Sequence, residues 1–240
     1  MHFSVKEVGC ARLFLRACDM GKYNGIYNRF IKRIIALVLS LILFVVLLPV
    51  FIIISIAVAV DSGFPVFYRA PRGGYKGKPF RIFKFRTMVK DADKIGGGTT
   101  ALHDSRITKV GGFLRKTKLD EIANLLCIIK GDMCFIGPRP ELLQYTDNYD
   151  EAEQVILKVR PGITDYSSLE FISLDEIVGE ENADEYYEKY VLKEKNKLRI
   201  RYAESVSFGT DVRLFAQTVW SVMKKALKFI FVKEDKHGVH

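Results

Sequence analysis

The chain has 240 residues, enough for one soluble domain of ordinary size together with a membrane element. Its 37 Lys and Arg outnumber its 28 Asp and Glu, and the net charge of +9 suits anionic partners: nucleic acid, phospholipid headgroups or phosphorylated small molecules. The four cysteines form no C-x-x-C pair, which argues against a thiolate metal centre and against a disulfide framework.

The first expected elements are a basic segment at a membrane surface, residues 1–33, and a hydrophobic membrane helix, residues 34–60. No charged residue interrupts the second segment, and a helix needs about 20 apolar residues to cross a bilayer core. Pro49 lies inside it, where proline kinks or breaks a helix. The sequence therefore predicts an integral membrane protein.

Two topologies remain open for this helix. Pro49 alone slightly favours a kinked helix that spans the bilayer. Both flanks are basic, however, so the positive-inside rule permits both ends to lie in the cytoplasm, with a helix-break-helix that enters and leaves by one face. The basic flanking residues are Lys22, Arg29, Lys32, Arg33, Arg69, Arg72, Lys76 and Lys78. The residues alone leave the two topologies nearly even.

The remaining residues, 61–240, are expected to form one cytoplasmic domain. Residues 64–88 contain two β-rich runs around a Gly-rich turn, which predicts a hairpin. Residues 94–100 and 160–164 are expected to be loops. Between them, apolar residues recur at helical spacing from Gly112 to Lys130, which predicts one helix whose buried stripe lies beside Asp120.

Two helical segments are expected towards the C-terminus. The acidic residues of 175–190 predict a solvated helical face. Residues 211–232 predict a basic amphipathic helix with Phe215, Val219 and Met223 on one stripe and Trp220 beside it. Such a helix is typical of a membrane interface, and a core-packing helix is the alternative.

The residues that can carry chemistry are arginines, lysines and carboxylates. The few histidines do not suggest a Ser-His-Asp triad, and the sequence contains neither the H-E-x-x-H motif of zinc proteases nor a Walker motif. Arg suits bidentate phosphate contacts, and carboxylates hold Mg²⁺ together with substrate phosphates. The segments concerned are "KFRTM" (84–88), "DSRIT" (104–108), "LRKTKLDE" (114–121), "GDM" (131–133) and "GPRP" (137–140). Together they predict a site for a magnesium-bound diphosphate.

These segments, in this order and spacing, resemble the bacterial sugar transferases, the monotopic polyprenyl-phosphate phosphoglycosyl transferases. The resemblance runs from "FPVFY" (64–68) through "RPGIT" (160–164), and extends to the hydrophobic segment and the C-terminal "YAESVSFGTDVRLFAQT" (202–218). The length corresponds to the family's minimal catalytic core. The implied fold class is α+β: a membrane-embedded re-entrant helix, and a small cytoplasmic, mostly helical domain with a β-hairpin and interfacial amphipathic helices.

The resemblance implies a Mg²⁺-dependent transfer of a phosphosugar from a UDP-sugar to undecaprenyl (polyprenol) phosphate, with release of UMP. It implies that Asp120 is the nucleophile, that Glu121 binds Mg²⁺ beside it, and that Arg115 engages phosphate. Pro138, Arg139 and Pro140 would contact the nucleotide. Lys84 and Arg86 are added from their charge, as groups for anionic parts of the substrate.

The resemblance places the protein in the bacterial inner membrane, with the catalytic domain on the cytoplasmic face, at the first membrane step of a glycan pathway such as exopolysaccharide synthesis. The lipid bilayer is then a partner, nucleic acid is not, and a homodimer is allowed. The physics agrees, because cations offset the repulsion between a carboxylate and a diphosphate and keep Asp120 ionised.

Three departures from the family pattern are Ala123, Cys127 and Asp165. The first two predict changes in packing. The third could reflect a subgroup or a different sugar, so the identity of the transferred sugar stays open. The competing hypotheses are a catalytically idle membrane scaffold for a glycan assembly complex, a membrane-tethered nucleic-acid binder, and an enzyme with another nucleotide donor.

Overall fold

The computed structural model describes residues 22–92, 104–172 and 183–234. The helices are α2 (Lys32–Ser62), α4 (Lys109–Thr117), α5 (Asn124–Lys130), α6 (Leu143–Thr146), α7 (Tyr166–Glu170), α9 (Ala183–Tyr186), α10 (Leu192–Ser205) and α11 (Phe208–Glu234). The short 3₁₀ and π segments are η1 (Lys22–Asn24), η2 (Tyr27–Ile31), η3 (Tyr75–Gly77), η4 (Leu119–Ala123), η5 (Glu153–Lys158) and η6 (Tyr187–Val191). The strands are β1 (Phe67–Tyr68), β2 (Pro71–Arg72), β3 (Phe80–Arg81), β4 (Lys84–Phe85), β5 (Cys134–Ile136) and β6 (Gly162–Thr164). The described chain is thus mixed and rich in helix, as expected.

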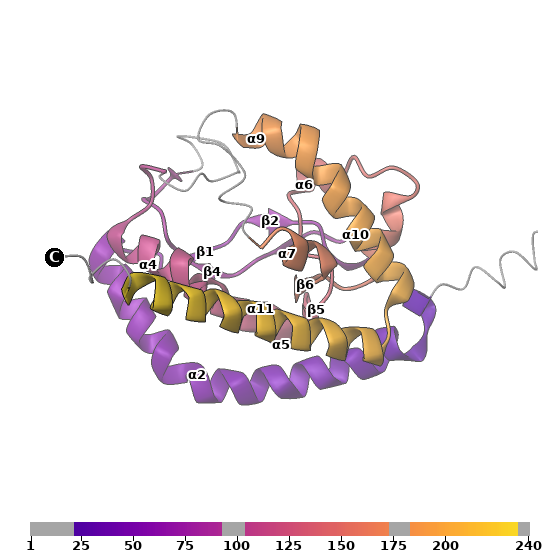
Figure 1. Cartoon of the computed structure of the whole chain (residues 1–240), viewed down its shortest axis with the longest axis horizontal. Helices are drawn as coiled ribbons and strands as arrows, with labels where there is room; N and C mark the ends of the chain where they lie inside the picture. The colour runs from indigo at the N-terminus through magenta and orange to yellow at the C-terminus, as the bar shows by residue number, and fades with distance from the viewer. Residues whose placement is uncertain (1–21, 93–103, 173–182, 235–240) are drawn as a thin grey trace, which may run out of the picture.

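The apolar helix α2 lies along one side of the molecule (Figure 1). Within the described residues, Tyr27–Ser62 is one helix long and apolar enough to cross a membrane, by length and composition; its most apolar stretch has a mean hydropathy of 3.4 and is only 17% buried. The helix predicted to break at Pro49 continues through this residue, since α2 runs unbroken from Lys32 to Ser62, although Figure 1 shows that it bends along its length. Proline removes one hydrogen bond and crowds the preceding turn, which bends a helix that other contacts support.

Both ends of α2 attach to the same folded body. Near its start, Arg33 donates hydrogen bonds to the carbonyls of Ile128 and Ile129 at the end of α5. Near its end, Asp61 accepts a hydrogen bond of 3.1 Å from the backbone N–H of Val110 in α4. The side of α2 that faces this body contributes Ala36, Phe51, Ile54 and Val58 to the main core.

The hairpin predicted for residues 64–88 is confirmed as two short antiparallel pairs. Strand β1 pairs with β4, and β2 pairs with β3 inside it, around the Gly-rich turn. The residues of 160–164 differ from the expected loop, since β6 pairs in parallel with β5. Two glycines permit this close approach: a Cβ on Gly162 would lie 2.2 Å from the backbone nitrogen of Gly137.

The helix predicted from Gly112 to Lys130 is wrong in one respect: it is divided in front of the carboxylate pair. Lys118 adopts the left-handed conformation, with φ 59°, and ends α4. The chain then continues as η4 and α5. Helical spacing of apolar residues does not report such a turn, because Lys118 itself is exposed and polar.

The expected C-terminal amphipathic helix is present as α11. Its inner face includes Leu214, which is fully buried, while Phe215, Val219, Trp220 and Met223 are exposed. An exposed apolar stripe argues against the core-packing alternative. The loop expected at 94–100 lies outside the described residues, as do residues 1–21 and the first part of 175–190.

Candidate active site

The carboxylate pair is held by the left-handed turn at Lys118. That turn places Asp120 and Glu121 in the first turn of η4, between α4 and α5. Asp120 is 7% exposed. A left-handed non-glycine residue is strained, and such residues cluster at functional sites.

The two carboxylates have opposite surroundings. Glu121 is neutralised on two sides: Lys84 donates a hydrogen bond of 3.0 Å to its Oε1, and Arg139 binds both of its oxygens, at 3.0 Å for Nη1 to Oε2. Asp120 has no such partner among the described residues, and its Oδ1 is buried without a hydrogen bond.

These surroundings move the two pKa values apart. Burial raises the pKa of Asp120, and the charge of Glu121 adds to this, while Lys84 and Arg115 oppose it. For Glu121, burial is outweighed by Arg139 and Lys84, which hold its pKa well below the usual range. The sequence led us to expect that cations keep Asp120 ionised. The cations do lower its pKa, but burial raises this pKa by more. Titratable groups with separated pKa values are typical of catalytic sites.

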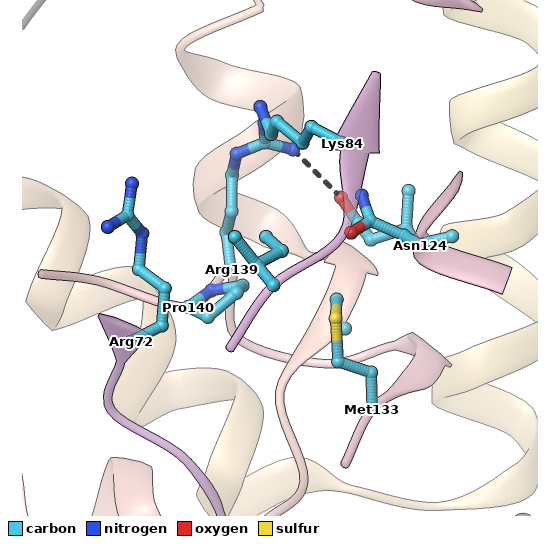
Figure 2. Close-up of a pocket in the computed structure, with 9 residues that line it drawn as sticks. Arg72, Lys84, Asn124, Met133, Arg139 and Pro140 are labelled. Atoms are coloured by element: carbon cyan, nitrogen blue, oxygen red, sulfur yellow. Dashed lines mark hydrogen bonds between the residues drawn. The ribbon is translucent and has the colours of Figure 1, made fainter. Parts of the chain in front are cut away.

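A pocket lies beside the pair. Its lining residues are Arg72, Ile82, Lys84, Asn124, Met133, Arg139, Pro140, Gly162 and Ile163. Arg72 and Arg139 both line it, and Figure 2 shows their side chains extending in the same direction in this view. The parallel pairing of β5 with β6 supports the Arg139 loop, because Pro138 accepts a hydrogen bond of 3.0 Å from Gly162 N–H.

The structure thus brings five of the eight residues predicted for the site close together through contacts: Lys84, Glu121 and Arg139 by ion pairs, Pro140 by the pocket lining, and Asp120 by its place next to Glu121. Arg115 acts on Asp120 electrostatically. Pro138 is buried, and its carbonyl accepts the hydrogen bond that attaches the loop to Gly162.

Arg86 has a different environment from the one its prediction implies. Its guanidinium is buried and donates hydrogen bonds to Ser62 and to the carbonyl of Gly63, at the end of α2. A positive charge at a helix C-terminus is stabilising, so this arginine holds the C-terminal end of α2. Its role in substrate binding stays a prediction.

The departures Ala123 and Cys127 are both fully buried, as packing positions should be. Asp165 is also buried, and its carboxylate caps α7 by accepting from Ser168 N–H at 2.8 Å. Met133 of the "GDM" segment lines the pocket, whereas the pocket residues Arg72 and Asn124 were not predicted from the sequence. Arg72 stands in the Gly-rich turn run that predicted the hairpin, and nothing in the periodicity marks it.

The fit to Mg²⁺ rests on one carboxylate oxygen. No group of three or more His, Cys, Asp or Glu side chains is gathered in the described part of the chain. Mg²⁺ commonly uses one or two carboxylates with substrate phosphates and water. The unpaired Asp120 Oδ1 suits that use, whereas a role for Glu121 requires it to exchange a contact with Lys84 or Arg139.

Comparison with known proteins identifies the family. Residues 27–225 match the family described as bacterial sugar transferase. The chain belongs to this family.

Three similar proteins are the uncharacterized sugar transferase EpsL of Bacillus subtilis (strain 168), the UDP-glucose:undecaprenyl-phosphate glucose-1-phosphate transferase of Escherichia coli (strain K12), and the UDP-N-acetylgalactosamine-undecaprenyl-phosphate N-acetylgalactosaminephosphotransferase of Aeromonas hydrophila. The first is 33% identical over 69% of this chain and 74% of its own length. The second is 38% identical over 48% of this chain. The third is 33% identical over 48% of this chain. The alignments span only 26% and 28% of the E. coli and Aeromonas proteins.

Proposed function

We propose that this protein is a phosphoglycosyl transferase that moves a phosphosugar from a UDP-sugar to undecaprenyl phosphate and releases UMP. Similar proteins carry this activity in their names, with glucose in one and N-acetylgalactosamine in another. The observation that carries the proposal is the buried carboxylate of Asp120, whose unpaired oxygen lies beside a Glu121 fixed by two cations.

In the first step, an oxygen of Asp120 attacks the phosphorus that bears the sugar. The bond from this phosphorus to the bridging oxygen breaks, and UMP leaves with the electron pair. Covalent catalysis by a carboxylate divides one difficult displacement into two easier ones. Glu121 and the two cations that bind it, Lys84 and Arg139, are held in fixed positions by their contacts. These charges therefore need little rearrangement during the transfer.

In the second step, a phosphate oxygen of undecaprenyl phosphate attacks the same phosphorus. The acyl-phosphate bond to Asp120 breaks, the product is an undecaprenyl diphosphate sugar, and the carboxylate is regenerated. Mg²⁺, held by Asp120 with Glu121 in support, would supply charge neutralisation at the diphosphate. Arg115, in the last turn of α4, would add a positive charge to the same region.

We also propose that α2 is re-entrant and that the folded body lies on the cytoplasmic face of the bacterial inner membrane. A 31-residue helix would span about 46 Å if straight, yet its start is held by α5 and its end by α4. Both attachments belong to one body, so both ends belong on one side of the bilayer. The outward face of α2 and the exposed stripe of α11 are apolar, as contact with lipid requires.

The topology can be tested with single cysteines at Arg29 and Lys90, both exposed, in a background without Cys10 and Cys18. A membrane-impermeant maleimide added to intact cells should label neither position and should label both after lysis. Labelling of one position alone in intact cells would establish a spanning helix.

The test of function is UMP release by nanodisc-purified protein with Mg²⁺, undecaprenyl phosphate and a panel of UDP-sugars. Release over many turnovers that requires both the lipid and the metal, and that Asp120→Asn abolishes, is the expected result and identifies the sugar. A folded protein that releases no UMP from any donor would favour the scaffold hypothesis or another nucleotide.

A further inference from the structure

Of the three cations that line the pocket beside the carboxylate pair, Arg72 forms no ion pair with a carboxylate of the described residues. Lys84 and Arg139 both bind Glu121. Arg72 donates one hydrogen bond, of 3.0 Å, to the carbonyl of Pro71. A guanidinium has five N–H donors, and among the described residues no carboxylate forms an ion pair with this one.

The surroundings of Arg72 disfavour its charge. Burial lowers the pKa of Arg72, and the positive charge of Arg139 acts in the same direction. Glu141 acts on Arg72 from nearby, but this carboxylate is bound by Arg199 at 2.6 Å and also faces Lys195. Two arginines that line one pocket, only one of which is paired with a carboxylate, form a site that an anion stabilises.

A second unmatched group lies in the same pocket. Asn124 is 2% exposed, and its Oδ1 accepts no hydrogen bond. Its side chain points into the pocket, as Figure 2 shows. An unpaired buried acceptor is costly unless a bound group supplies the donor. The pocket therefore needs both an anion and a hydrogen-bond donor.

The size of the pocket limits what enters it. Its volume of about 70 Å³ is far below the ~300–1,000 Å³ of pockets that enclose a drug-sized ligand. It takes one part of an extended substrate, while the rest lies outside.

We propose that Arg72 binds a phosphate of the nucleotide diphosphate sugar, and that Asn124 Oδ1 accepts a hydrogen bond from a hydroxyl or N–H group of the same donor. The inference rests on the proposed function and deepens it. The lipid acceptor fits less well, because beyond its phosphate it carries only hydrocarbon and offers nothing to Asn124. A nucleotide sugar carries both features within one molecule.

The decisive variant is Arg72→Gln, with Arg81→Gln as the matched control. Arg81 is exposed and stands on β3, the strand that pairs with Arg72's own strand. We expect Arg72→Gln to raise the KM for the UDP-sugar by at least tenfold, to leave the KM for undecaprenyl phosphate within about twofold, and to keep the thermal unfolding midpoint. Arg72→Lys should recover part of the loss, since a point charge replaces the planar group. Arg81→Gln should match the wild type.

Asn124→Leu, which keeps the branched skeleton of the side chain and removes the acceptor, should also raise the donor KM alone. An unchanged donor KM in Arg72→Gln would overturn the inference, and so would a rise confined to the KM for undecaprenyl phosphate.

Direct binding separates this inference from the proposed function. Isothermal titration of UDP into the wild type and into Arg72→Gln needs no turnover. If no UDP-sugar supports UMP release, the proposed function fails, yet a tenfold weaker affinity for UDP in Arg72→Gln would still support the phosphate site. Equal affinities would overturn it.

Discussion

Arg139, on the loop after β5, grips both carboxylate oxygens of Glu121, the residue next to Asp120. The pair joins a loop to a 3₁₀ turn 18 residues away. It fixes the orientation of Glu121. Asp120 is then the carboxylate of the pair that has a buried oxygen without a hydrogen bond. This division of roles predicts the effects of substitutions at Arg139 and Lys84.

Arg139→Lys should lower kcat/KM by about 10²-fold, the typical effect of removing one preorganised donor from a charged site. A lysine cannot reproduce the two-pronged contact with a carboxylate. The measurement is UMP release under saturating lipid, with Arg81→Lys as the control. Activity within twofold of the wild type would show that the fork on Glu121 is dispensable.

The acid limb of the pH profile should report Asp120. Because burial raises its pKa, activity is lost as the pH falls through a value above 3.8, whereas Glu121 stays ionised throughout. Lys84 opposes the rise, so Lys84→Gln should move the limb to higher pH. The measurement is kcat/KM for the donor, which reports the free enzyme. A limb that stays in place, or moves to lower pH, contradicts this assignment.

Gly111→Ala should destabilise the protein strongly, while Gly112→Ala should not. A Cβ on Gly111 would lie 2.0 Å from the carbonyl oxygen of Thr87, whereas a Cβ on Gly112 would meet only Ile107, at 3.9 Å. Both glycines lie in α4, so the second variant gains helix propensity of about 1 kcal/mol. Thermal unfolding in detergent should show a large loss for Gly111→Ala and a rise of roughly 2–4 °C for Gly112→Ala. Similar midpoints for the two variants would contradict the close packing of α4 on Thr87.

Glu141→Gln should lower the unfolding midpoint by about 10 °C, because removing one partner leaves the buried Arg199 uncompensated at a cost of ~3–5 kcal/mol. Burial opposes its ionisation, yet Arg199 and Lys195 lower the pKa of Glu141 to about 2, from 4.5. A lowered carboxylate pKa stabilises the fold above pH 4.5, and this contribution is lost as the pH falls towards 2.

The Glu141→Gln variant should therefore lack the part of the acid-dependent loss of stability that protonation of Glu141 causes. Glu194→Gln, at an exposed pair with Lys197, is the matched control and should change the midpoint by less than about 2 °C. An equal effect of the two substitutions would contradict a structural role for the Glu141 pair.

The sequence predicted the elements whose signals are local. The apolar run of α2, the hairpin around its Gly-rich turn and the amphipathic α11 follow from composition and period. The order of the motifs indicated the family and the residues of the carboxylate pair.

Features that depend on tertiary contacts could not be predicted in this way. The left-handed Lys118 has no periodic signature, and the parallel pairing of β6 requires Gly137 and Gly162 to meet from distant parts of the chain. Arg86 was assigned from charge alone, whereas its partners at the end of α2 lie 23 and 24 residues earlier in the chain. The pKa of Asp120 is raised because the side chain is buried, and burial cannot be read from the sequence. The neighbouring cations in the sequence suggest the opposite shift.

The central claim is that Asp120 carries the phosphosugar. The most direct measurement mixes enzyme, Mg²⁺ and the active UDP-sugar without undecaprenyl phosphate, and follows both UMP release and the intact mass of the protein. The account predicts a burst of about one UMP per active site, a protein heavier by one phosphosugar, and loss of both in Asp120→Asn. UMP release that requires the lipid from the first turnover, with no modified protein at any time, would contradict it.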